Sequence, residues 1–117
     1  MSLSNKPIVW LPFAAGGMLA ALLVPALMLV LLLDALQLLP PGSLDYPRVV
    51  AFVSHPLARV VCVGVIALLL WHAAHRLRMT VQDIGVRSHG ARQVAARLCY
   101  GAATLASVAL IWAVVVL

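Results

Sequence analysis

Residues 11–39 read LPFAAGGMLAALLVPALMLVLLLDALQLL. This run contains one charged residue, Asp34, and a helix of about 20 apolar residues is long enough to cross the hydrocarbon core of a bilayer. Two further apolar runs follow at residues 56–78 and 98–117. Together the three runs occupy most of the 117 residues. The sequence therefore predicts an all-α membrane protein, residues 1–117 forming one transmembrane domain of three spanning helices.

The composition excludes several other classes of protein. Hydrophobic residues make up 65% of the chain and charged residues only 9%, whereas roughly a quarter of the residues of a soluble domain are charged. Two cysteines are too few for a secreted disulfide scaffold. The net charge of +5 could suggest nucleic-acid binding in a soluble chain. Here the basic residues lie at the edges of apolar runs, as in membrane proteins, so we expect no nucleic-acid partner.

Prolines and polar residues mark the connections between the predicted spans. Pro40, Pro41 and Gly42 end the first apolar run. A short amphipathic stretch beginning at Asp45 is expected to lie along the membrane interface, with Tyr46 at headgroup level. A polar joint is expected from Gln82 to Arg97. Arg59 lies just inside the outer end of the second run, where its long side chain is expected to reach the interface.

The distribution of basic residues predicts the orientation in the membrane. With the N-terminus inside, six of the eight basic residues lie on the inner side: Lys6, Arg76, Arg78, Arg87, Arg92 and Arg97. Only Arg48 and Arg59 then lie outside. The excess of basic residues on cytoplasmic segments therefore predicts an N-in, C-out chain. In this topology the start of the first span and the end of the second meet at the inner face.

Small residues recur at four-residue spacing in the first and third spans. Examples are Gly16 with Ala20 and Ala103 with Ser107. Such faces let helix backbones approach closely inside a membrane, so we expect them to pack within this chain's own bundle. Three short helices still leave a large lateral surface. We therefore expect the chain to pack as one subunit of a larger membrane assembly.

Two histidines at the end of the second span are the main candidates for chemistry. His72 and His75 are three residues apart and share one helix face. One of them could ligate haem or a metal, with the other ligand coming from elsewhere. Alternatively, Trp10, His75 and Arg76 could provide the polar groups of a quinone pocket, with the rings of Phe13 and Trp71 as apolar walls. A third interpretation is an ordinary belt of aromatic and basic residues at a membrane interface.

Several motifs are similar to those of one known family. They are Val9-Trp10, the run from Phe13 to Met18, the run from Asp45 to Phe52, Ala58-Arg59-Val60, Leu70-Trp71 and His75-Arg76. In this order and spacing, over nearly the whole chain, they resemble the D subunit of bacterial quinol:fumarate reductase. That protein is the smaller of two hydrophobic membrane anchors. The chain departs from the family pattern after His75, where it reads Arg76-Leu77-Arg78-Met79 instead of several histidines.

The resemblance implies a complex in the bacterial cytoplasmic (inner) membrane. Its partners would be a second hydrophobic anchor, an iron–sulfur subunit carrying iron–sulfur clusters and a flavoprotein subunit carrying FAD that reduces fumarate to succinate. The anchors would bind menaquinol (oxidised to menaquinone) at a shared site. The family's quinone-binding residues match Trp10, Phe13, His75 and Arg76 here. The resemblance implies neither haem nor catalytic residues in this chain.

Two rival functions follow from the same sequence. One is the anchor of a succinate dehydrogenase containing haem b, in which His72 or His75 ligates the iron. The other is a small transporter or channel component. That class would need an acidic residue near the membrane centre, and Asp34 lies too close to the end of its span.

Overall fold

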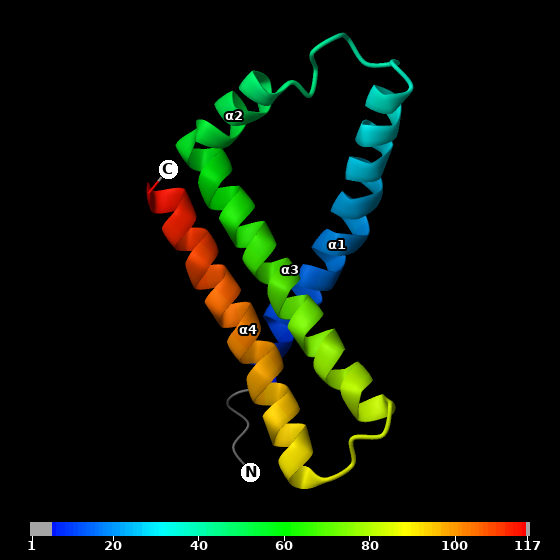
Figure 1. Cartoon of the computed structure of the whole chain (residues 1–117), viewed down its shortest axis with the longest axis vertical. Coiled ribbons are helices and arrows are strands. Elements are labelled where there is room, and N and C mark those ends of the chain that lie inside the picture. Colours follow the sequence, from blue (N-terminus) through cyan, green and yellow to red (C-terminus); the bar gives the residue numbers. More distant parts are fainter. Residues whose placement is uncertain (1–5, 117) are drawn as a thin grey trace.

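The computed structural model describes residues 6–116, which form four helices joined by short connections (Figure 1). The helices are α1 (Lys6–Ala35), α2 (Tyr46–Ser54), α3 (Pro56–Asp83) and α4 (His89–Val116). Three of them, α1, α3 and α4, are long and apolar enough to cross a membrane. No strand occurs within the described residues. The predicted all-α class with three long apolar helices is confirmed.

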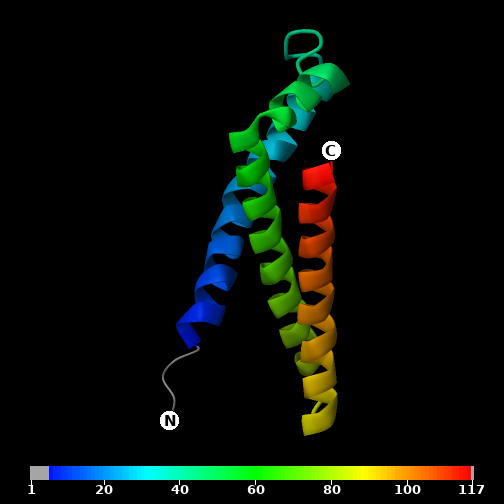
Figure 2. The same ribbon diagram turned by 90° about the vertical axis from the view of Figure 1, so that its left-hand side faces the viewer.

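Helix α3 is the centre of the arrangement, because among the described residues each of the other helices packs against it and not against another. Helix α4 runs beside α3 in the opposite direction along most of its length (Figures 1 and 2). Helix α1 crosses α3 obliquely, and its C-terminal half diverges from α3 (Figure 1). The short helix α2 lies at the end of the molecule where α3 begins.

The crossing of α1 and α3 depends on two glycines of α1. A Cβ atom at Gly16 would collide with the carbonyl oxygen of Leu68 and lie 2.8 Å from the Cβ of His72. A Cβ atom at Gly17 would lie 2.8 Å from Cε1 of His72. The small residues of the first span therefore permit close packing inside this chain's own bundle, as their spacing predicts.

Helix α1 ends four residues before the predicted end of the first apolar run, Leu39. The last helical residue is Ala35, and Gln37 adopts a positive φ of 57°. The backbone N–H of Leu38 donates to the carbonyl of Leu33 at 2.9 Å. A residue in the left-handed region that caps the last carbonyls is a common way to end a helix. Apolarity alone does not reveal this local reversal.

The polar joint between the second and third spans is much shorter than the predicted Gln82–Arg97. Helix α3 continues to Asp83, past the predicted Arg78, and α4 begins at His89 instead of Leu98. Gly85, with φ of 124°, turns the chain after α3. The hydroxyl of Ser88 accepts from the N–H of Ala91 at 3.3 Å and caps α4. The predicted bounds followed the ends of the apolar runs, whereas local turns and capping hydrogen bonds determine where the two helices end.

Most large apolar side chains face outward. Within residues 6–116, the buried apolar side chains are those of Ala74 and Ala103, which are 6% and 7% exposed. By contrast, Leu22, Leu27 and Met28 in α1 are each more than half exposed. In water such a surface would be unstable, since there is almost no core to offset it. The surface is suited to lipid and to neighbouring membrane subunits.

Candidate functional site

An aromatic cluster joins the start of α1 to the C-terminal half of α3. The ring of Phe13 stacks on the imidazole of His72, with centroids 4.7 Å apart and planes at 7°. The same ring lies 4.3 Å from the centroid of His75, tilted by 48°. His72 and His75 both reach Phe13 because residues three apart share a helix face. The packing thus brings the two predicted segments together at one end of the bundle.

His72 fastens the two helices to each other. Its Nδ1 lies 2.9 Å from the backbone carbonyl oxygen of Phe13. A carbonyl oxygen can only accept, so Nδ1 of His72 is the donor and carries the proton. The ring also lies over Gly17, where any larger side chain would strike it. His72 therefore has a role in positioning α1 against α3.

His75 makes a second connection, to α4. Its Nδ1 lies 2.7 Å from the hydroxyl oxygen of Tyr100. Nη1 of Arg78 donates to the same oxygen at 3.3 Å. The Tyr100 ring packs against Trp71, with centroids 4.9 Å apart, and the Arg78 guanidinium lies 5.8 Å from its centre. We call Phe13, His72, His75, Tyr100, Trp71 and Arg78 the histidine cluster.

The four residues predicted to bind quinone do not all enter this cluster. Phe13 and His75 touch each other and are half-buried. Trp10, one helical turn before Phe13, is 66% exposed. The side chain of Arg76, next to His75, is also exposed. Trp10 and Arg76 are therefore accessible to a ligand or to another subunit, whereas Phe13 and His75 are fixed by contacts within the chain.

Sequence reasoning did not include Tyr100 or Arg78 in the site. Tyr100 is a lone phenol near the start of a long apolar run, which on its own suggests an interfacial side chain. The signal that identifies it is the antiparallel pairing of the second and third spans. Because the two helices are joined by a short turn at residues 84–88, residues a similar distance from this turn face each other. Applying that register places Tyr100 opposite the histidines.

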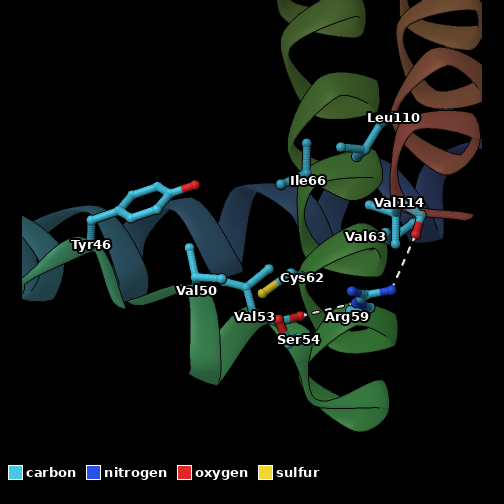
Figure 3. Close-up of a pocket in the computed structure, with 10 residues that line it drawn as sticks. All are labelled: Tyr46, Val50, Val53, Ser54, Arg59, Cys62, Val63, Ile66, Leu110 and Val114. Atoms are coloured by element: carbon cyan, nitrogen blue, oxygen red, sulfur yellow. Dashed lines mark hydrogen bonds between the residues drawn. The ribbon is translucent and has the colours of Figure 1, made fainter. Parts of the chain in front are cut away.

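The opposite end of α3 has a different kind of connection (Figure 3). Nε of Arg59 donates to the carbonyl oxygen of Val53 at 3.3 Å, and Nη1 donates to that of Val114 at 3.4 Å. Both acceptors lie in the last turns of their helices, α2 and α4, where carbonyls have no partner within the helix. Arg59 therefore binds two helix ends. Whether its side chain also lies at the membrane interface stays a prediction.

Next to Arg59 is an apolar cleft of about 430 Å³ between α2, α3 and α4 (Figure 3). Its apolar walls are formed by four valines together with Ile66, Leu110, Tyr46 and Cys62. Cys62 and Cys99 are both free thiols. Among the described residues, no group of three or more histidine, cysteine or acidic side chains could hold a metal ion.

Comparison with known proteins gives a consistent result. The family model for the D subunit of fumarate reductase matches residues 1–115. The fumarate reductase D subunit of Aliivibrio fischeri (strain MJ11) is 38% identical over 106 residues, covering 90% of this chain and 86% of the relative. The protein of the same description from Mycobacterium tuberculosis (strain ATCC 25618 / H37Rv) is 39% identical over 112 residues, covering 93% and 86%. Three membrane-spanning helices in an all-α chain, together with these matches over nearly its whole length, show that the protein belongs to the family of fumarate reductase D subunits.

Proposed function

We propose that this chain is the small membrane anchor of a quinol:fumarate reductase and that its histidine cluster forms one wall of the quinol site. The observation that carries the proposal is the contact of Phe13 with His75, at 4.3 Å between ring centroids. It places an apolar ring beside a group that can exchange protons, at the end of the bundle where most of the chain's arginines lie. A quinol head needs this combination of a flat apolar wall and hydrogen-bonding groups.

Each residue has a separate part in the proposed site. Phe13 packs against the quinone ring, and Trp10 and His75 bind or orient its oxygen atoms. Arg76 adds positive charge, which favours electron-rich forms of the ring over neutral ones. Trp10 and Arg76 are both exposed, so they remain free to reach a ligand held between subunits.

The chemistry at this site is the removal of two electrons and two protons from menaquinol, which yields menaquinone. The electrons pass through an iron–sulfur subunit to the FAD of a flavoprotein subunit, where fumarate takes up two electrons and two protons to become succinate. His75 holds a ring oxygen through an imidazole N–H, and the two quinol protons pass to water at the cytoplasmic face. No haem is needed in this scheme.

The proposed complex includes a second hydrophobic anchor. Helix α1 diverges from α3 and presents large apolar side chains along its C-terminal half (Figure 1). The quinol would then lie between this chain and its partners at the cytoplasmic face, with the N-terminus inside.

The test separates quinol oxidation from fumarate reduction in the assembled, membrane-bound complex. We expect Trp10→Leu and His75→Ala each to lower quinol-driven fumarate reduction at least tenfold, because each removes a group that binds the quinol. Reduction of fumarate by a soluble dye donor should be unchanged. Trp112→Leu is the matched control. Trp112 is exposed to a similar extent as Trp10, but it lies near the C-terminal end of α4, away from the histidine cluster. Unchanged quinol kinetics in both site variants would refute the proposal.

A further inference from the structure

We infer that Tyr100 is a positioning residue, which fixes the proton of His75 on Nε2 and so presents an N–H donor to the quinone carbonyl. This inference rests on the proposed quinol site. It concerns a residue of α4 that makes no contact with the ligand in the proposed site. Tyr100 acts only through His75, whose Nδ1 lies 2.7 Å from the phenol oxygen.

The donors and acceptors around the phenol fix the direction of this hydrogen bond. A guanidinium can only donate, so the oxygen of Tyr100 accepts a hydrogen bond from Arg78. The hydroxyl has one proton of its own to donate. The nitrogen of His75 is its nearest partner, at 2.7 Å. If His75 donated instead, the hydroxyl proton of Tyr100 would need another acceptor.

The consequence is a pair of opposite tautomers. In neutral His75, Nδ1 accepts from Tyr100 and Nε2 carries the proton. In His72, Nδ1 carries the proton and donates to the Phe13 carbonyl. Of these two histidines, His75 is therefore the one that offers an N–H on the nitrogen without a hydrogen bond among the described residues. A quinone carbonyl can only accept, so this tautomer is the one that recognises the oxidised ring.

The geometry allows the hydroxyl to be removed without disturbing the packing. The Tyr100 ring is held by Trp71 at 4.9 Å between centroids, a contact that phenylalanine would retain. Tyr100→Phe therefore deletes the bonds of the hydroxyl to His75 and Arg78 and keeps the ring contact. Tyr46→Phe is the matched control, because Tyr46 is 80% exposed and lies at the other end of the molecule.

The direct test is the tautomer of His75 in the intact complex. Nitrogen-15 chemical shifts of labelled histidine distinguish a proton on Nδ1 from one on Nε2, and the signal lost in His75→Gln identifies the residue. We expect a neutral ring protonated on Nε2, and a mixture of tautomers in Tyr100→Phe. A proton on Nδ1, or a ring protonated on both nitrogens, would overturn the inference. So would a spectrum that Tyr100→Phe leaves unchanged.

The functional test is a double-variant cycle on quinol oxidation. Tyr100→Phe should lower quinol-driven activity about three- to tenfold, the size of one lost hydrogen bond, while dye-driven activity is unchanged. A glutamine side chain at position 75 places an N–H donor near Nε2 without needing Tyr100. In the His75→Gln background, Tyr100→Phe should therefore have no further effect. An equal loss in both backgrounds would show a structural role and overturn the inference.

The two tests separate this inference from the proposed function. If Trp10→Leu and His75→Ala both leave quinol oxidation unchanged while the tautomer shifts in Tyr100→Phe, the hydrogen bond is established and the quinol site is refuted. If His75→Ala abolishes quinol oxidation and the tautomer does not respond to Tyr100→Phe, the quinol site stands and the role of Tyr100 is refuted.

Discussion

Two arginines tie the ends of α3 to its neighbours, and they bind different kinds of group. Arg59 donates to backbone carbonyls of α2 and α4. Arg78 donates to the hydroxyl of Tyr100, which bonds in turn to His75. Helix-end carbonyls are present in any sequence and need a partner wherever water is scarce. The Arg59 contacts therefore meet a requirement of the fold.

No such requirement of the fold explains the hydroxyl of Tyr100 at the Arg78 end of α3. Phenylalanine at position 100 could pack against Trp71, and a leucine at position 75 could fill space beside Phe13. Polar side chains shielded from water carry a cost unless they are bonded, and here three of them bond to one another. The contrast indicates that the Arg59 end holds the structure together, whereas the Arg78 end retains polar groups for binding or chemistry.

The largest expected effect, on assembly or quinol-driven activity, comes from disrupting the crossing of α1 and α3. This crossing contributes to the Arg78 end of α3 and not to the Arg59 end. Gly16→Ala places a methyl group against the Leu68 carbonyl, so α1 must move away from α3 and Phe13 must leave His75. Overpacking of this kind costs about 1–3 kcal/mol. We expect at least a tenfold loss of assembled complex or of quinol-driven activity, measured in isolated membranes.

The control for this experiment is Gly64→Ala, also in a spanning helix. A Cβ atom at Gly64 would meet nothing within 4 Å. It should leave assembly and activity unchanged. Equal loss in the two variants would show that any added methyl disturbs these helices, and the proposed crossing would then have no special role.

The second effect is on stability and tests the Arg59 end. Arg59→Met keeps the length of the side chain but leaves the carbonyls of Val53 and Val114 without their donor. We expect the complex to lose about 1–3 kcal/mol of stability, seen as a lower midpoint of thermal unfolding in detergent. The Michaelis constant for quinol should not change.

Arg48→Met is the matched control for Arg59→Met, since Arg48 is an exposed arginine of α2. Arg48→Met should leave the midpoint of thermal unfolding unchanged. If Arg59→Met raised the Michaelis constant for quinol without lowering the unfolding midpoint, the Arg59 end would have a role in quinol binding, contrary to the role assigned to it here.

The smallest effect is expected from Arg78→Met. Without the guanidinium, the Tyr100 hydroxyl loses one donor but can still reach His75, so the preference for one tautomer weakens without disappearing. Quinol-driven activity should fall about threefold, which corresponds to roughly 0.6 kcal/mol, at the low end for one hydrogen bond. The unfolding midpoint should be close to that of Arg87→Met, a change in the connection between α3 and α4. A large drop in midpoint would instead make Arg78 a second structural arginine.

The sequence was sufficient for the coarse fold because lipid sets a simple rule. Apolar runs of about 20 residues must be helices, since backbone groups cannot remain unpaired in the bilayer. Helix ends were less predictable, because a capping hydroxyl such as Ser88 or a positive φ at Gln37 acts locally and independently of hydropathy. The N-terminal end of α4 at His89 is the clearest example.

The candidate site was partly predictable for a related reason. The antiparallel order of the first two spans brings Phe13 near His75, and the structure places these rings in contact. The rotation of each helix about its axis is set by packing, so the sequence could not show that His72 would bond to the Phe13 carbonyl. For the same reason Tyr100 was missed, and the bonds of Arg59 to two helix ends were not predicted.

The proposed quinol site requires the start of α1 and the C-terminal half of α3 to lie together at the cytoplasmic face. The most direct measurement is labelling of Trp10→Cys and Arg76→Cys, each in a Cys62→Ala/Cys99→Ala background, with a membrane-impermeant maleimide. Inverted and right-side-out vesicles expose opposite faces. We predict that both cysteines react in inverted vesicles only and that bound quinol analogue protects both. Reaction of the two positions from opposite sides would contradict the proposed site.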